Sequence, residues 1–89
     1  MLLYIGQGQS IPKKDIVGVF AATALQSEVT AEFIQTASDE GFLVRNEEEP
    51  VKSFIVADER VYFSAIVPST LRRRSLSRVG TALPKEISD

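Results

Sequence analysis

The sequence predicts a small α+β domain. About five short strands form a β-sheet, with one main helix and a short C-terminal helix. The chain has 89 residues, the length of one domain. Short β-branched and aromatic runs recur between glycine, proline and charged clusters, which is typical of strands. Two other segments carry apolar residues at helical spacing. The predicted order of elements is therefore β-β-α-β-β-β-α.

The first two strands are predicted on either side of a glycine-containing turn. Residues 2–5 (Leu-Leu-Tyr-Ile) form the first strand, and residues 6–10 form the turn, where glycine adopts positive φ cheaply. The Gly-x-Gly there lacks the third glycine of a dinucleotide fingerprint and leads into Pro12, so we interpret it as a hairpin turn and not a phosphate cradle. Residues 16–20 form a buried second strand, in which Gly18 indicates the close approach of another group.

The main helix is predicted over residues 28–40. Ser27 is expected to cap its N-terminus with the side-chain oxygen, and Gly41 to end it in the left-handed conformation. Acidic and polar residues occupy one face of this helix. Four apolar residues share the other face and are expected to pack on the sheet: Val29, Phe33, Ile34 and Ala37.

Three further strands follow the main helix. Residues 42–44 form the first, and the Glu-Glu-Glu-Pro run of residues 47–50 is a polar connection that no buried strand could hold. Residues 52–57 and 61–66 then form a hairpin around the charged turn of residues 58–60.

The second helix is predicted over residues 71–78, with Ser69 or Thr70 as its cap. Leu71 and either Ser75 or Leu76 are expected to face inward. Three consecutive arginines follow Leu71 and cover more than half of the helix circumference, so at least two of them point to solvent or to a partner. We predict one domain over residues 1–78 and a flexible tail over residues 79–89.

The composition restricts the chemistry of the chain. It holds 10 Lys and Arg against 12 Asp and Glu, and no His, Cys or Trp. Disulfides, zinc sites with the usual ligands, and His- or Cys-based catalysis therefore have no residues to use. We predict a protein that is not an enzyme, with no metal, cofactor or small-molecule substrate. A domain this short without disulfides usually needs another source of stability, and self-assembly into a homo-oligomer is the expected one.

The sequence also bears on location. Residues 1–9 lack the basic region and long apolar run of a secretion signal. No stretch approaches the roughly 18 apolar residues of a membrane span. We therefore expect a cytoplasmic protein without a membrane partner.

Charge is unevenly distributed along the chain. Residues 1–20 carry a net charge of +1, residues 21–51 carry −6, residues 52–78 carry +4 and residues 79–89 carry −1. Two interpretations remain open. The basic segments can form one positive face on a protein of net charge −2, or both signs can simply keep a small domain soluble.

Four segments stand in a distinctive order and spacing. They are Lys14-Asp15-Ile16-Val17-Gly18-Val19-Phe20, Glu32-Phe33-Ile34, Lys52-Ser53-Phe54-Ile55-Val56, and the run from Tyr62 to Arg74 that contains Pro-Ser-Thr-Leu-Arg-Arg-Arg. Together they resemble the extracellular matrix regulatory proteins of Gram-positive bacteria over roughly residues 1–78. That family has a RemA and a RemB branch, and the Asp-Ile-Val-Gly-Val-Phe and Pro-Ser-Thr-Leu-Arg-Arg-Arg segments look like the RemB branch.

The resemblance implies a small α/β protomer that assembles into closed rings. In the RemA branch the ring binds DNA through arginines repeated around it and activates biofilm matrix genes. Here Lys52 matches a basic stretch before a strand, and either Lys14 or Asp15 matches a second basic position. If Asp15 is the match, the charge at that position is reversed.

These considerations define two overlapping sets of candidate residues. The DNA-binding candidates are Lys13, Lys14, Lys52, Arg72, Arg73 and Arg74. The candidates for an oligomer interface are Arg72, Arg74, Tyr62, Glu28 and Glu32. Arginine forms bidentate bonds with phosphate and with carboxylate alike, so the three arginines fit either role.

Other interpretations of the same residues stay open. The lysines are also typical of a solvated sheet edge, where they discourage unwanted strand pairing. Tyr4, Tyr62 and Phe63 could stack on bases if exposed, although apolar strands favour a place in the core or an interface.

Our leading hypothesis is a ring-forming regulator of biofilm matrix gene expression that binds DNA in a weak, salt-sensitive way. The second hypothesis is an oligomeric scaffold or adaptor that binds protein partners and not DNA. Net acidity, Asp15 and the Glu47-Glu48-Glu49 run favour the second.

Overall fold

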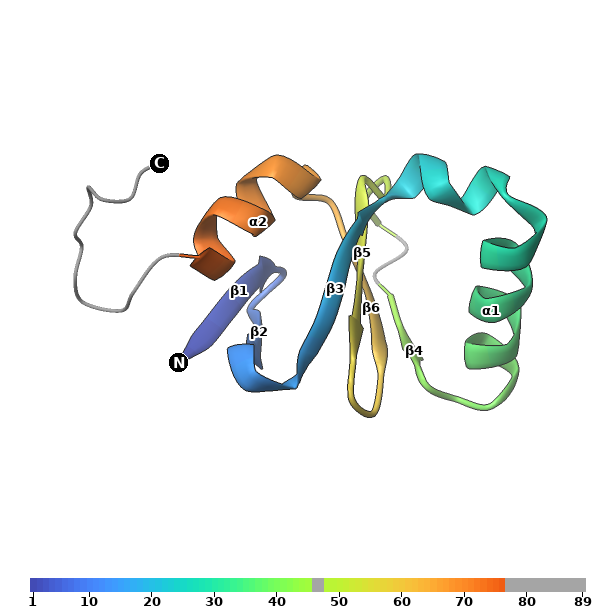
Figure 1. The fold of residues 1–89 in the computed structure, drawn as a ribbon, viewed down its shortest axis with the longest axis horizontal. Coiled ribbons are helices and arrows are strands. Elements are labelled where there is room, and N and C mark those ends of the chain that lie inside the picture. Colours follow the sequence, from blue (N-terminus) through green and yellow to red (C-terminus); the bar gives the residue numbers. More distant parts are fainter. Residues whose placement is uncertain (46–47, 77–89) are drawn as a thin grey trace.

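The computed structural model describes residues 1–45 and 48–76 and has three layers (Figure 1). Seen along its edge, a four-stranded sheet forms the middle layer. On one side lie a two-stranded hairpin and a short helix, and on the other side lies the main helix. The outer elements are β1 (Leu2–Gly6), β2 (Gln9–Pro12), α1 (Glu28–Asp39) and α2 (Pro68–Leu76). The predicted α+β class with two helices is confirmed.

The middle sheet has the strand order β3-β5-β6-β4. Its strands are β3 (Ile16–Ala21), β4 (Leu43–Val44), β5 (Ser53–Ala57) and β6 (Val61–Ser64). β3, β5 and β6 pair antiparallel, and β4 runs parallel to β6. β5 is central and largely buried, whereas β3 and β4 form the two edges. The prediction of a buried strand over residues 16–20 is wrong, because β3 lies at an edge and has no buried residue. Six strands in two sheets thus replace the single sheet of about five strands that the sequence predicts.

The additional strand is β2, which lies partly in the predicted turn of residues 6–10. The turn itself is tighter, because Gln7 and Gly8 alone connect the strands, with φ of 57° and 73°. Two positive φ values are typical of the type I′ turn that joins two antiparallel strands. The hairpin turn inferred from the Gly-x-Gly is therefore confirmed, but its partner strand is Gln9–Pro12 and not residues 16–20.

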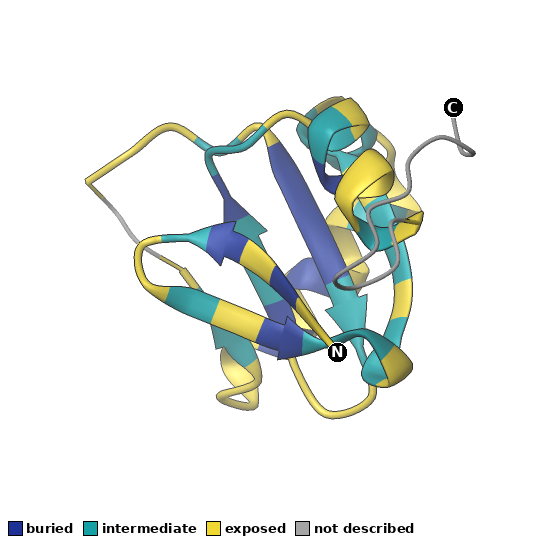
Figure 2. Cartoon of the chain, turned by 90° about the vertical axis from the view of Figure 1, so that its left-hand side faces the viewer, coloured by how far each residue is buried: buried dark blue, intermediate teal, exposed yellow. Residues whose placement is uncertain are grey.

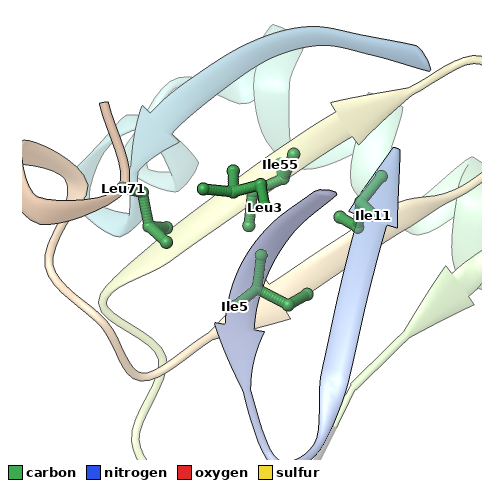
Figure 3. Close-up of a cluster of buried hydrophobic side chains, with 5 residues drawn as sticks. All are labelled: Leu3, Ile5, Ile11, Ile55 and Leu71. Carbon is green, nitrogen blue, oxygen red and sulfur yellow. The ribbon is translucent and has the colours of Figure 1, made fainter. Parts of the chain in front are cut away.

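Two hydrophobic clusters hold the layers together. The first joins the hairpin to α2 and to one face of the sheet through Leu3, Ile5, Ile11, Ile55 and Leu71 (Figure 3). Buried and exposed residues alternate along β1, as expected for a strand with one face on the core (Figure 2). The second cluster lies on the other face of the sheet and consists of Ile34, Ala37, Phe54 and Val61. β5 contributes to both clusters, which explains its continuous apolar sequence.

The N-terminal and C-terminal ends of α1 are capped in different ways. Ser27 occupies the N-cap position as predicted, but its side chain makes no hydrogen bond to the helix, so that part of the prediction is wrong. Its carbonyl oxygen accepts a bond from the Ala31 N–H at 2.9 Å. Gly41 has a φ of 81°, and the Phe42 N–H donates to the Ala37 carbonyl at 2.8 Å. These features are typical of a Schellman motif and confirm the predicted glycine stop.

Only part of the predicted apolar face of α1 is buried. Ile34 and Ala37 pack on the sheet, whereas Val29 is 76% exposed and Phe33 is 46% exposed. The sheet is narrow on this side because β4 has only two residues. The helix therefore has an apolar flank that residues 1–45 and 48–76 do not cover.

α2 begins at Pro68, three residues earlier than predicted. Proline suits the first helical position because it needs no N–H partner there. Ser69 and Thr70 consequently lie inside the helix, and neither is its cap. Leu71 is buried as predicted, and β6 ends at Ser64, two residues before the predicted end. The tail of residues 79–89 and the predicted last turn of the helix lie outside the described residues.

Gly18 has the close neighbour that the sequence predicts. A Cβ atom added there would lie 2.7 Å from the ring of Phe20, which stacks on Phe54 with a centroid distance of 5.2 Å. A β-bulge between Ile16 and Gly18 leaves Val17 exposed on the edge strand.

Candidate functional site

The two α-helices carry opposite charges and lie at opposite ends of the molecule (Figure 1). α1 lies at one end and has the acidic residues Glu28, Glu32 and Asp39 without a single base (Figure 1). α2 lies at the other end and has three arginines without an acid. The part of the predicted segregation of charge that falls in the two helices is thus also a segregation in space.

Two of the three arginines of α2 bind backbone carbonyl groups of edge strands. The Arg72 Nη2 donates to the Val19 carbonyl oxygen of β3 at 3.0 Å. The Arg74 Nη1 donates to the Tyr4 carbonyl oxygen of β1 at 3.3 Å, and its guanidinium lies 6.0 Å from the Tyr4 ring centroid. Residues one and three positions after the buried Leu71 flank it on the helix, so these two arginines extend to opposite sides of α2.

The two carbonyl groups that Arg72 and Arg74 bind point away from the paired neighbouring strand. In an antiparallel ladder, alternate residues direct their N–H and C=O groups to the partner strand and to the open edge. An open edge is a template for pairing with another chain. Arg72 and Arg74 therefore tie α2 to the edges of β3 and β1 and cover part of each edge.

Arg73 is the exception in this run. It is exposed and makes no hydrogen bond or ion pair with any described residue. At two positions after Leu71 it is on the outward side of α2. It is the arginine of this helix that is fully available to a partner.

This difference predicts unequal effects of alanine substitution within α2. Arg72→Ala should lower the free energy of unfolding by about 0.5–1.5 kcal/mol, because it removes one hydrogen bond to the edge of β3. Arg73→Ala should change it by less than about 0.5 kcal/mol, since it breaks no bond to any residue that the structure describes. Urea denaturation at a fixed protein concentration measures both. Equal effects of the two variants would contradict the assignment of Arg72 as the edge-binding residue.

Lys13 and Lys14 lie in a single 3-10 turn (Lys13–Asp15) between the hairpin and β3. The Lys14 Nζ lies 3.6 Å from the Asp15 Oδ1, and the two side chains are 85% and 34% exposed. The Asp15 carbonyl oxygen accepts a bond from the Asp58 N–H at 2.9 Å, which attaches the turn to the β5–β6 hairpin. Asp15 thus partly neutralises the most exposed lysine of this end.

Lys52 lies at the opposite end of the same ladder. Its carbonyl oxygen accepts a bond from the Ala22 N–H at 3.0 Å, just beyond the pairing of Ala21 with Ser53. The six residues from Ile16 to Ala21 separate it from the lysine turn, a distance of roughly 20 Å at about 3.3 Å per residue. The structure therefore does not bring the lysines of the two ends together in one protomer.

The aromatic candidates occupy different environments. Tyr62 is half-buried and packs against the first core cluster. Phe63 is half-buried on the other side of the sheet, with the guanidinium of Arg45 5.4 Å from its ring centroid. Tyr4 is 49% exposed on the outer face of β1.

Sequence reasoning missed several exposed apolar side chains. They include Leu2, Val17, Val29, Phe33 and Leu76. A signal for Val29 was present in the sequence, because it stands at the edge of the apolar stripe next to acidic residues. Leu76 does not lie on the inward-facing side of α2. Of the two residues predicted to face inward beside Leu71, Ser75 is more buried than Leu76.

Two further observations concern the described part of the chain. No group of three or more His, Cys, Asp or Glu residues in it could hold a metal ion. None of its helices is long and apolar enough to cross a bilayer.

The chain is similar to known proteins over nearly all of the fold described above. The family model of RemA-like proteins, described as extracellular matrix regulatory protein A-like, matches residues 2–75. The extracellular matrix regulatory protein B of Bacillus subtilis (strain 168) is 28% identical over 75 residues, which cover 84% of this chain and 90% of that protein. The matched residues run from β1 to the last turn of α2.

Proposed function

Since the chain belongs to the RemA-like family of extracellular matrix regulatory proteins and is RemB-like within it, we propose that it is a non-enzymatic regulator that assembles into a ring, binds DNA and controls extracellular matrix genes. The family is one of regulatory proteins, and the relative named above is bacterial. The observation that carries the proposal of assembly is the placement of an acidic helix and a basic helix at opposite ends of one protomer.

This distribution of charge suits head-to-tail assembly. Unlike surfaces at the two ends allow each copy to contact the next one in the same way. Such an interface closes into a ring when the rotation between neighbours divides a full turn, and otherwise continues as a filament. A small domain also gains stability when neighbouring copies cover its exposed apolar residues.

Assembly would also increase the number of lysines that can contact one DNA duplex, which is small in a single protomer. Lys14 and Lys52 lie at opposite ends of the β3–β5 ladder, so a single copy offers few phosphate contacts at any one place. Repetition around an oligomer would place many such contacts along one duplex. Phosphate contacts carry no base information, so we expect DNA binding with little sequence preference beyond the ease of bending the duplex.

An oligomeric scaffold that binds protein partners is the second candidate function. The ion pair between Lys14 and Asp15 favours it, because it reduces the positive field where DNA would bind. Exposed Glu48 and Glu49 and a net charge of −2 favour it as well.

The experiment that separates the two functions measures the mass of the protein by light scattering on a sizing column. The runs include and omit a long duplex DNA, at low and at moderate salt. A large assembly that co-elutes with DNA at low salt and releases it as salt rises supports the DNA-binding regulator. A large assembly that ignores DNA at every salt concentration leaves the scaffold, and a monomer at micromolar concentration contradicts both.

Charge variants should alter DNA binding in opposite directions. Lys14→Glu with Lys52→Glu should abolish co-elution, whereas Asp15→Asn should extend it to higher salt, because Lys14 then keeps its full charge. For every phosphate that a variant no longer neutralises, the plot of log K against log salt should become shallower by about 0.9. Gln26→Glu adds a negative charge outside the candidate set and should leave binding nearly unchanged. Weakening of DNA binding by Gln26→Glu in proportion to its added charge would indicate a response to net charge alone.

A further inference from the structure

The outward side of α2 combines one free cation with one exposed apolar side chain. Leu71 faces the core, so the residues two and five positions later point away from it, at about 100° per residue. These are Arg73, which has no partner among the described residues, and Leu76, which is 82% exposed. Three positions separate them, so they are neighbours on the helix surface.

The outward side of α1 has the complementary pair. Ile34 faces the core, and the residues two and five positions before it point away from the core for the same reason. They are Glu32, which makes no ion pair with the described residues, and Val29, which is 76% exposed. On the same helix, Asp39 accepts a bond from the Gln35 Nε2 at 2.9 Å, whereas Glu32 has no such partner among the described residues.

The order of these residues along the two helices is opposite. In α1 the apolar residue comes first and the acid follows three positions later. In α2 the base comes first and the apolar residue follows three positions later. When two such helices cross antiparallel, Val29 meets Leu76 and Glu32 meets Arg73 at the same time. A parallel crossing would place the carboxylate against the leucine.

We propose that the outward side of α1 docks antiparallel on the outward side of α2 of a second copy of this chain. The inference rests on the proposed assembly and names its contact surface. Charge complementarity identifies the occupant, because the two helices carry opposite charges and stand at opposite ends of one molecule. Every copy then has one surface of each kind, and a head-to-tail contact covers both.

The proposed contact gives the three arginines of α2 different roles. Arg73 forms the ion pair with the neighbouring copy, while Arg72 and Arg74 keep their bonds to β3 and β1. Docking also leaves the lysines at the two ends of the β3–β5 ladder outside the contact. The lysine candidates for DNA binding therefore differ from the residues of the proposed contact, so DNA binding can be disrupted at the lysines without loss of assembly.

Charge reversal tests the contact without touching the core. Glu32→Arg and Arg73→Glu each place like charges across the interface, so the mass measured by light scattering should fall toward the 9.8 kDa of one chain. Mixing the two variants in equal amounts should restore a large assembly, because alternating copies then have opposite charges at every contact. Circular dichroism checks that each variant is folded. Glu59→Arg and Arg60→Glu, both exposed in the β5–β6 turn, are matched controls that should keep the mass of the unaltered protein.

The outcomes distinguish this inference from the function on which it rests. A monomeric unaltered protein would overturn both. An unaltered protein that assembles, together with charge-reversed variants of unchanged mass, would overturn the contact and leave the proposed function standing. Variants that fail to assemble and do not recover on mixing would also overturn the pairing of Glu32 with Arg73. Restoration on mixing supports it, because a fault within one chain cannot be corrected by another.

Discussion

Replacing Leu71 by alanine is expected to lower the free energy of unfolding by about 2–5 kcal/mol, the usual cost of a large-to-small change in a core. Leu71 is 0% exposed and stands between the hairpin and the sheet, in contact with the cluster of Leu3 and Ile55. It is the one fully buried side chain of α2 among the described residues. Its truncation leaves a cavity and removes the apolar contact that holds this helix on the sheet.

Chemical denaturation followed by circular dichroism measures this effect at a fixed protein concentration, because assembly adds to apparent stability. Leu2→Ala is the matched control. The same atoms are removed from a side chain that is 61% exposed on β1, so the expected change is within about 0.5 kcal/mol. A similar drop in stability in both variants would mean that Leu71 is not the anchor of α2.

The second large effect is expected for Ser64→Ala. The Ser64 Oγ donates to the Ile5 carbonyl oxygen at 2.8 Å and accepts a bond from the Ile66 N–H at 3.0 Å. It therefore links the hairpin to the sheet and satisfies two backbone groups. Alanine leaves both groups without this partner, and each buried unsatisfied group costs about 1–3 kcal/mol.

Thermal unfolding compares Ser64→Ala with Ser10→Ala. Ser10 is exposed on β2, so the same chemical change there should leave the midpoint within about 2 °C. A midpoint for Ser64→Ala that equals that of Ser10→Ala would show that the hydroxyl is not needed to join the two sheets.

These two variants also bear on the proposed assembly. α2 presents Arg73 and Leu76 to a neighbouring copy only if Leu71 holds the helix in place. The hairpin in turn provides the surface on which Leu71 packs, and Ser64 joins that hairpin to β6. We therefore expect both variants to weaken assembly as well as stability, whereas Glu32→Arg should weaken assembly alone.

Local sequence was sufficient to predict most of the elements. The β-branched and aromatic runs at β5 and β6 and the helical spacing in α1 agree with the structure because local preference and burial act together there. β3 forms where it was predicted although none of its residues is buried. Gly41 ends α1 as predicted, since positive φ is a property of the residue itself. β2 was missed because Gln9, Ser10 and Pro12 are poor strand formers, and pairing with β1 outweighs their preference.

Some features of the candidate site could likewise be predicted from the sequence, and others could not. The separation of acidic from basic segments was visible in the sequence and persists in the fold. The bonds from Arg72 to Val19 and from Arg74 to Tyr4 join residues 53 and 70 positions apart, so no local pattern could have indicated them. Equally, an amphipathic pattern does not reveal how much of an apolar face the rest of the chain will cover, as Val29 illustrates.

The sequence alone determined the α+β class, the position of the main helix, the opposite charges of the two helices and the resemblance to the extracellular matrix regulatory proteins. These properties depend on residue type and on spacing within a few turns of the chain. Only the tertiary structure decided that Arg72 and Arg74 bind strand edges while Arg73 bonds to none of the described residues, and that Val29 and Leu76 remain exposed. The physical reason is that hydrogen bonds and burial depend on which distant segments meet, and that pairing is set by the packing of the whole chain.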